Sequence, residues 1–223
     1  MIGTSRLAKC RLPFSLDRFG RRLTSQYDED GIIYELIRLL DTPRYFVEFG
    51  AHPAECNCLA LSTAWPGLFM DGADWGKLFI KREFITPANI NQLLDKYDVP
   101  SEIGVLSIDI DGQELWVWQA IERSAAITVV EYNPQLGPDV SVSVARDDRF
   151  VWDYSVYQGA SLKAHTKLAD QKDLQLVYAN GQNAFFVDRT LFDNHDDFKY
   201  EEMWRPSLAN HPPDKLHRKW IEF

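Results

Sequence analysis

The sequence predicts an α/β fold whose mostly parallel sheet ends in a C-terminal antiparallel hairpin. Between residues 29 and 132, apolar runs alternate with segments of helical periodicity. This pattern is typical of parallel strands joined by right-handed crossovers. Farther along, the apolar runs 174–179 and 184–187 flank Asn180-Gly181. Because Asn and Gly both tolerate positive φ, Asn-Gly between apolar strands is a strong hairpin signal.

The individual elements follow from apolar spacing and from turn residues. A helix is predicted after Asp28-Glu29-Asp30, since acids suit the positive end of a helix, and it ends before Pro43. Its apolar residues recur at helical spacing, at Ile32, Ile33, Leu36, Ile37, Leu39 and Leu40. Strands are predicted at 45–49, 67–71, 78–85, 104–110 and 127–132. Crossover helices are predicted over Ala54–Ala64, with Cys56 and Cys58 as packing residues, and around Leu115, Trp118 and Ile121.

The first strand–helix–strand unit has the spacing of a nucleoside-binding site. Its first strand contains Glu48 and ends at Gly50, and ligands of open α/β sheets bind outside the carboxyl ends of the strands. Asp71 ends the second strand about 20 residues after Gly50, where an acidic residue accepts hydrogen bonds from ribose hydroxyls. The alternative is an ordinary strand–helix turn with a hydrogen-bonded Glu48.

Composition indicates a globular protein. The chain has 223 residues, of which 45% are hydrophobic and 26% charged. No apolar run approaches the ~20 residues that span a bilayer. Cys10, Cys56 and Cys58 form neither a disulfide framework nor a zinc motif, so we expect a reducing compartment, the cytoplasm.

The net charge of −9 is unevenly distributed. Residues 1–24 contain six basic residues and one acidic residue, and the acidic remainder argues against a broad nucleic-acid interface. We expect residues 1–24 to form a basic surface arm, with a transit peptide as the alternative, and residues 25–223 to form one domain.

Acidic residues follow two further strands of the predicted sheet. Asp109 and Asp111 follow the fourth strand, and Glu131 and Asn133 follow the fifth. If these strands are neighbours, the four side chains converge near the crevice. Two chemical interpretations remain open: a hard divalent cation held by oxygen ligands, or a general base for a substrate hydroxyl. The structural alternative is that Asp109 binds loop amides and Asp111 caps the next helix.

Asp109-Ile110-Asp111 is also the DxD pattern of metal-dependent glycosyltransferases. In that interpretation the two carboxylates hold Mn²⁺ or Mg²⁺ against a nucleotide-sugar diphosphate. The sequence contains no HxxxH, HExxH, GxSxG or P-loop motif. Zinc hydrolases, serine hydrolases and kinases are therefore disfavoured, and no dedicated metal-ligand motif is assigned.

Taken together, these blocks resemble the FkbM-like methyltransferase family, in its bacterial branch with an SQYGEDG entry motif. That motif reads SQYDEDG at 25–31 here. The resemblance covers about residues 24–190 and runs through ordered blocks at 46–51, 55–57, 67–72, 84–90, 106–112, 131–133, 137–138 and 180–187.

The resemblance implies a Rossmann-like class I methyltransferase sheet that binds S-adenosyl-L-methionine and methylates an oxygen of a small-molecule or carbohydrate acceptor. It places the cofactor against Glu48, Gly50, Ala51, Asp71, Gly72, Phe84 and Asp109. The implied catalytic residues are Asp109, Asp111, Glu131 and Asn133, with Asp109 as base or orienter.

Three departures from the family pattern affect the cofactor crevice. Asp28 replaces a glycine of the entry motif, and His52-Pro53-Ala54 replaces a glycine-rich turn. Only residues 73–77 separate the second strand from the predicted third strand, where the family carries a helix. A non-enzymatic binding module with this fold is therefore an alternative.

The missing helix should uncover an apolar sheet face near Leu68, Met70, Leu78 and Ile80. Exposed apolar area of that kind is usually covered by another part of the chain or by a partner. We expect either a homodimer or a cover formed by Trp75 and the basic arm.

Overall fold

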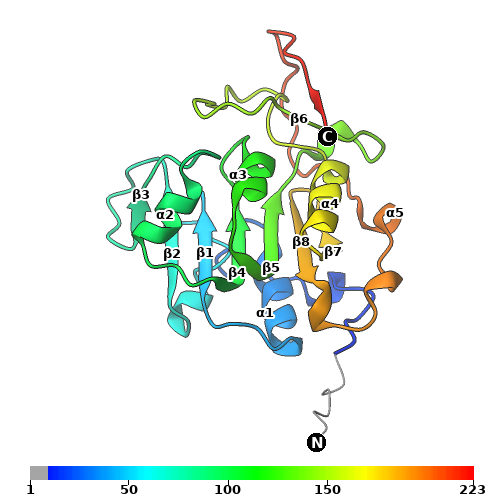
Figure 1. Ribbon diagram of the computed structural model, residues 1–223. Coiled ribbons are helices and arrows are strands. Elements are labelled where there is room, and N and C mark those ends of the chain that lie inside the picture. The colour runs from blue at the N-terminus through cyan, green and yellow to red at the C-terminus, as the bar shows by residue number, and fades with distance from the viewer. Residues whose placement is uncertain (1–9) are drawn as a thin grey trace, which may run out of the picture.

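The computed structural model describes residues 10–223, and its centre is a seven-stranded sheet in the order β3-β2-β1-β4-β5-β8-β7. The strands of this sheet are β1 (Phe46–Phe49), β2 (Gly67–Asp71), β3 (Ile80–Arg82), β4 (Glu102–Ile108), β5 (Ser124–Glu131), β7 (Leu174–Ala179) and β8 (Asn183–Asp188). Strands β1 to β5 pair in parallel, whereas β8 is antiparallel to both β5 and β7 (Figure 1). The predicted α/β, Rossmann-like fold with a C-terminal hairpin is confirmed.

Strand β1 lies in the interior of the sheet between β2 and β4, and all four of its residues are buried. Short runs of apolar residues suit strands covered on both faces. Parallel register brings the carboxyl ends of β1, β2 and β4 to one edge, because Phe49 pairs with Met70 on one side and with Ile108 on the other. This edge carries the predicted site residues.

The α-helices are α1 (Glu29–Leu39), α2 (Ile90–Lys96), α3 (Glu114–Ala120), α4 (Leu162–Gln171) and the short α5 (Tyr200–Met203). Short 3-10 helices occur at Asp17–Phe19, Leu61–Thr63, Pro134–Leu136, Arg189–Leu191 and His195–Asp197. Helices α2, α3 and α4 lie side by side over one face of the sheet (Figure 1). Helix α1 confirms the helix predicted after residue 28, and helix α3 confirms the helix predicted around residues 115–121.

The predicted crossover helix over Ala54–Ala64 is wrong. This segment consists of turns and one 3-10 helix at Leu61–Thr63. Its backbone N–H groups are bound elsewhere: Cys56 donates to the Thr24 carbonyl at 2.8 Å, and the next two residues donate to Glu48. An α-helix would need those N–H groups for its own ladder. Cys56 and Cys58 are buried free thiols, so they are packing residues outside any helix.

The connection from β2 to β3 is short, and β3 spans Ile80–Arg82 rather than the predicted 78–85. The expected uncovered apolar face is wrong for Leu68, Met70 and Ile80, which are all buried. It is correct for Leu78, whose side chain is 97% exposed. The loss of a crossover helix therefore exposes the loop before β3 rather than the sheet itself.

The described part of the basic arm, residues 10–24, packs beside the C-terminal region at its start and against the segment after β1 at Arg22 and Thr24, and not over the β2–β3 connection. Leu12 exchanges backbone hydrogen bonds with the Asn194 side chain, at 2.9 and 3.0 Å, and Leu12 and Leu16 are buried. The expectation that the arm covers the gap is wrong for these residues. The first nine residues lie outside the described part of the chain.

The segment around β6 (Val142–Ser143) and the C-terminal strand β9 (Ile221–Glu222) pair as a separate antiparallel sheet. Figure 1 places this region beyond the carboxyl ends of β1, β4 and β5. Within residues 10–223, no helix has the length and apolar character needed to cross a membrane.

Candidate functional site

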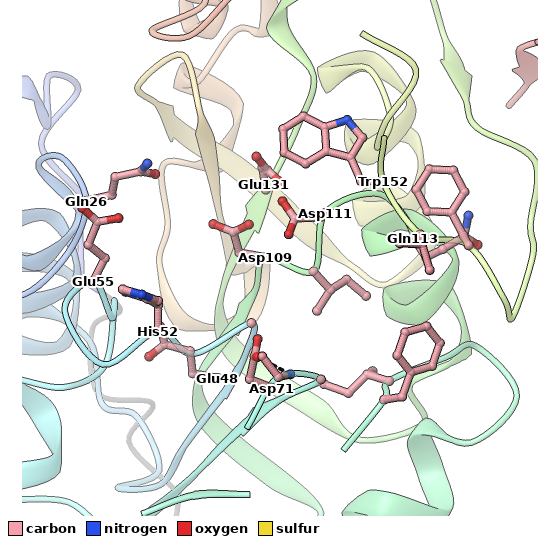
Figure 2. Close-up of a pocket in the computed structure, with 18 of the residues that line it drawn as sticks. Gln26, Glu48, His52, Glu55, Asp71, Asp109, Asp111, Gln113, Glu131 and Trp152 are labelled. Carbon is pink, nitrogen blue, oxygen red and sulfur yellow. Dashed lines mark hydrogen bonds between the residues drawn. The ribbon is translucent and has the colours of Figure 1, made fainter. Parts of the chain in front are cut away.

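A cleft of about 640 Å³ opens at the carboxyl edge of the parallel strands (Figure 2). It is lined by the ends of β1, β2, β4 and β5, by the start of β8, and by two outer segments at residues 147–154 and 209–211. Gly50, Asp71 and Asp109 all reach it. The side chains that would close it, His52 and Trp75, lie along its wall and leave it open.

The turn after β1 brings two strands of the sheet into direct backbone contact. Gly50 has φ +76°, and a Cβ placed on it would lie 1.4 Å from the Asp109 carbonyl oxygen. Gly50 and Ala51 both donate their N–H to the Met70 carbonyl, at 2.9 and 3.2 Å. The sequence-predicted role of Gly50 in a tight turn is thus explained by sterics. Ala51 is fully buried below this turn and does not line the cleft.

Glu48 holds the segment that follows this turn. Its two carboxylate oxygens accept the backbone N–H groups of Asn57 and Cys58, each at 2.8 Å. Burial raises the pKa of Glu48 to about 7, although these two hydrogen bonds act in the opposite direction. Glu48 lines the cleft and also holds the loop at residues 57–58. The alternative of an ordinary turn with a hydrogen-bonded Glu48 is therefore correct for these two hydrogen bonds.

Asp71 ends β2 at the lower side of the cleft as seen in Figure 2. Its Oδ1 accepts the Ala73 N–H at 2.7 Å and the Trp75 indole N–H at 2.9 Å, so both bonds use the same oxygen. The Trp75 ring meets the His52 ring edge-to-face, with centroids 4.5 Å apart. Gly72 and the half-exposed Phe84 continue this wall.

The entry motif at residues 25–31 reaches the opposite wall. Asp28 accepts hydrogen bonds from the Tyr178 hydroxyl at 2.6 Å and from the Asn180 amide at 2.7 Å. Asp28 therefore ties the motif to the β7–β8 hairpin. Gln26 and Tyr27 line the cleft next to it. Neither residue was assigned to the site from sequence, although the motif that contains them was noted.

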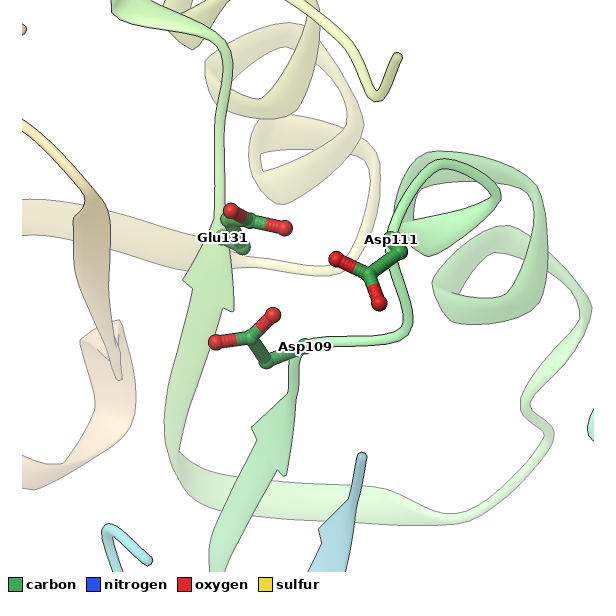
Figure 3. Close-up of side chains that lie close together, drawn as sticks. All are labelled: Asp109, Asp111 and Glu131. Carbon is green, nitrogen blue, oxygen red and sulfur yellow. The ribbon is translucent and has the colours of Figure 1, made fainter. Parts of the chain in front are cut away.

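Asp109, Asp111 and Glu131 form an acidic cluster at the centre of the cleft (Figure 3). One carboxylate oxygen from each lies within 4.8 Å of the other two. Register explains the meeting, because β4 and β5 are paired neighbours and their ends face the same edge. Asp111 projects from a left-handed backbone position with φ +58°, which brings its carboxylate back over the strand ends.

The charges in this cluster are mutually unfavourable. Burial, followed by the neighbouring charge of Asp111, raises the pKa of Asp109 to about 7. Burial and the charge of Asp109 raise the pKa of Glu131 well above its ordinary value. Burial and Asp71 also raise the pKa of Asp111. Like charges this close favour protonation of one carboxyl unless a cation compensates them.

The cleft as a whole is acidic. Its charged lining consists of eight carboxylates, and no lysine or arginine of residues 10–223 is among the lining residues. The carboxylates are Glu48, Glu55, Asp71, Asp109, Asp111, Glu131, Asp147 and Asp148. Such a site attracts cations and repels phosphates and other anions.

Asn133 does not belong to this cleft, contrary to its sequence-based assignment. Its amide donates to the carbonyls of Val156 and Gln158, at 2.8 and 3.0 Å, and its Oδ1 accepts the Gln135 N–H at 3.1 Å. The residue is buried and these partners use its polar atoms. It anchors the segment that follows β6 instead of facing a ligand.

The upper wall of the cleft was not predicted. Trp152 lies there (Figure 2), 4.9 Å from the Tyr154 ring and 4.7 Å from the His211 ring between centroids. Gln182 reaches Glu131 from the β7–β8 turn and donates a short hydrogen bond to its Oε1. The Asn180-Gly181 signal predicted the turn, but no local pattern indicated that the residue after it faces the cluster.

Comparison of the chain with protein-family models, with curated proteins and with solved structures gave no match.

Proposed function

We propose that the protein is an S-adenosyl-L-methionine-dependent methyltransferase that methylates a hydroxyl oxygen of a small-molecule or carbohydrate acceptor. The observation that carries the proposal is the position of Asp71 and of the Asp109 cluster on one open cleft, at the carboxyl edge of a sheet with an antiparallel β8. The ordered blocks that resemble the FkbM-like family support the same function.

The residues present suit the parts of this cofactor. Asp71 uses only Oδ1 for Ala73 and Trp75, which leaves Oδ2 for ribose hydroxyls. The acidic lining suits the positive sulfonium and ammonium groups. Gln26, which lies next to Glu55 in Figure 2, supplies an amide that suits the carboxylate end.

When bound, S-adenosylmethionine supplies an electrophilic methyl group. The contribution of this chain is to align an acceptor hydroxyl with that methyl group, which accounts for much of the acceleration in such transfers. Asp109, whose pKa of about 7 is close to neutral, accepts the proton that the hydroxyl loses. The aromatic wall at Trp152 provides a surface on which a sugar or ring can pack.

Cofactor binding is tested by isothermal titration of S-adenosylmethionine into the wild type, Asp71→Asn and Asp148→Asn. Both variants remove one carboxylate charge from the same cleft. Asp71→Asn should bind S-adenosylmethionine about 10-fold or more weakly, because it loses charged hydrogen bonds to the ribose. The affinity of Asp148→Asn should stay close to that of the wild type. Absence of heat at millimolar cofactor, or equal weakening in both variants, contradicts the assignment of the ribose site.

The role of Asp109 is tested with an acceptor found by screening polyols, sugars and phenols for formation of S-adenosylhomocysteine. Asp109→Asn should lower turnover by about 100-fold, within the range of general-base contributions, with Asp148→Asn as the control. Full turnover by Asp109→Asn removes Asp109 as the base.

Metal-dependent glycosyl transfer is the second candidate, favoured by the convergence of Asp109 and Asp111 with Glu131. It has less support, because an acidic cleft repels the diphosphate of a nucleotide sugar unless cations neutralise it. A thermal shift with UDP-glucose and Mn²⁺, combined with none for S-adenosylmethionine, would reverse this order. A thermal shift with neither ligand would favour the binding module.

A further inference from the structure

The three carboxylates of Asp109, Asp111 and Glu131 are already assembled from separate elements. Asp109 follows β4, Glu131 ends β5, and Asp111 lies in the turn before α3. Each offers an oxygen within 4.8 Å of the other two. Oxygens at such separations fit around one ion with metal–oxygen bonds of about 2.0–2.6 Å.

Two buried oxygen atoms on the β5–β8 side of the cleft have no hydrogen-bond partner within residues 10–223. Glu131 is 6% exposed, and its Oε2 has no hydrogen-bond partner within residues 10–223, although Oε1 accepts from Gln182. Figure 3 shows the Glu131 carboxylate directed toward the gap between Asp109 and Asp111. A buried polar atom without a partner is costly, so an unpaired oxygen at this position indicates a ligand.

The second atom is Oδ1 of Asn183, which is 2% exposed and also without a partner. Asn183 pairs with Glu131 across the β5–β8 ladder and lines the same cleft. Its Nδ2 donates to Glu29 at 3.0 Å, which identifies the remaining atom as the carbonyl oxygen. An uncharged amide oxygen on the residue opposite Glu131 is a ligand type that hard cations accept.

No lysine or arginine of the described chain neutralises the cluster. The salt bridges within residues 10–223 include none to Asp109, Asp111 or Glu131, and no lysine or arginine of that range lines the cleft. His211 is the basic neighbour whose charge acts on Asp111. Lysine and arginine side chains of residues 10–223 therefore leave the charge of the three carboxylates uncompensated.

We propose that Asp109, Asp111 and Glu131 bind one hard divalent cation, Mg²⁺, Mn²⁺ or Ca²⁺, in the cleft. Glu131 contributes its unpaired Oε2, and the cleft side of the ion stays accessible to oxygen ligands such as water or a substrate hydroxyl. A hydroxyl bound there becomes a stronger acid, since a bound cation favours its deprotonated form. The cation site does not depend on the methyl-transfer proposal, because the protein alone brings the three carboxylates together.

The competing arrangement is a shared proton between Asp109 and Glu131 with no ion at all. The same unfavourable charges raise the pKa of both groups in the absence of metal. The test must therefore separate a localised ion from protonation and from diffuse attraction to an acidic cleft.

The experiment is isothermal titration of MnCl₂, and separately of MgCl₂ and CaCl₂, into chelator-treated full-length protein without cofactor, at pH 8 and an ionic strength of about 0.15 M. We expect saturable one-to-one binding of at least one ion. Asp111→Asn and Glu131→Gln should each weaken it at least 10-fold, whereas Asp148→Asn, a cleft carboxylate outside the cluster, should stay within about twofold.

Asp111→Asn keeps the test decisive if Glu131→Gln does not fold. Asparagine tolerates the left-handed backbone of position 111 and preserves the side-chain size. Absence of saturable binding up to about 10 mM would overturn the proposal in favour of a shared proton. Equal weakening by Asp111→Asn and Asp148→Asn would also overturn it, since that result means diffuse attraction. Neither of these results bears on the titration of S-adenosylmethionine, so the cation site and the methyltransferase function are tested independently.

Discussion

Gly50 lies directly against the main chain of Asp109. A Cβ at Gly50 would lie 1.4 Å from the Asp109 carbonyl oxygen, and the Asp109 N–H donates to the Phe49 carbonyl at 3.1 Å. The turn of the proposed cofactor site and the first residue of the acidic cluster are therefore in backbone contact. A change in one should displace the other, and this contact links the two halves of the cleft.

Gly50→Ala should destabilise the protein by about 3 kcal/mol or more, because the methyl group meets backbone that cannot move without shifting β4. Gly76→Ala is the matched control. Gly76 also has positive φ, +62°, but nothing lies within 4 Å of its Cβ position. Gly76→Ala should lower the free energy of unfolding by only about 1 kcal/mol, the strain of an alanine in the left-handed conformation. Urea unfolding measures both values, and equal costs would show that the contact at Gly50 is unimportant.

Trp75→Phe should weaken S-adenosylmethionine binding about fivefold. The change removes the indole N–H that holds Asp71 Oδ1, a hydrogen bond worth about 1 kcal/mol, and keeps an aromatic ring near His52. Trp152→Phe changes the upper wall, away from Asp71 (Figure 2), and should leave cofactor affinity unchanged. Titration of both variants decides whether Trp75 belongs to the cofactor side; unchanged affinity in Trp75→Phe would exclude it.

The free energy of unfolding, measured with a chelator present, should fall as the pH rises from 6.5 to 8.5. Burial raises the pKa of Glu48 and of Asp109 to about 7, and of Glu114 to about 8. The folded state therefore holds protons that the unfolded state has already released, and this stabilisation is lost as the pH passes the folded pKa.

One buried histidine acts in the opposite sense at lower pH. Burial lowers the pKa of His165 from its ordinary value of 6.5 to about 3. The contribution of His165 to the free energy of unfolding therefore rises with pH up to about 6.5 and is constant above that pH. Above pH 6.5 the histidine contribution levels off, and the buried thiols, whose pKa values are also raised from 9.0, add to the fall only toward the alkaline end of the range. Asp109→Asn should flatten the pH dependence, because one of the raised carboxyls is gone. A stability that rises over this range would contradict the burial of these groups.

Asn133→Ala should cost about 2–4 kcal/mol of stability and leave cofactor affinity intact in the folded protein. The substitution leaves the buried carbonyls of Val156 and Gln158 and the Gln135 N–H without their partner. Chemical denaturation and cofactor titration on the same sample measure the two effects. Loss of affinity in a stable Asn133→Ala protein would restore the residue to the ligand site.

The features that local chemistry determines could be predicted from the sequence. The apolar periodicity after Asp28 corresponds to α1, and the strands β1, β2 and β5 end within one residue of their expected ends, although β5 begins three residues earlier than predicted. Parallel topology then places their carboxyl ends at one edge, which is why Asp109, Asp111 and Glu131 could be expected to meet.

The errors arise where distant residues override local preference. Ala54–Ala64 has helical composition, but Glu48 and Thr24 accept the N–H groups that a helix would use. Asn133 follows the fifth strand as a site residue would, yet carbonyls about 25 residues away bind its amide. The wall around Trp152 comes from a segment without regular structure, and its position depends on contacts such as that with His211.

The most direct measurement of the central claim is a crystal structure of the full chain with S-adenosylhomocysteine. The account predicts a ribose whose hydroxyls bind Asp71, an adenine beside Phe84, and a methionine portion next to Gly50 with its sulfur facing the Asp109 cluster. A cleft in which saturating S-adenosylhomocysteine leaves no density, or density at another surface, would contradict the proposed methyltransferase function.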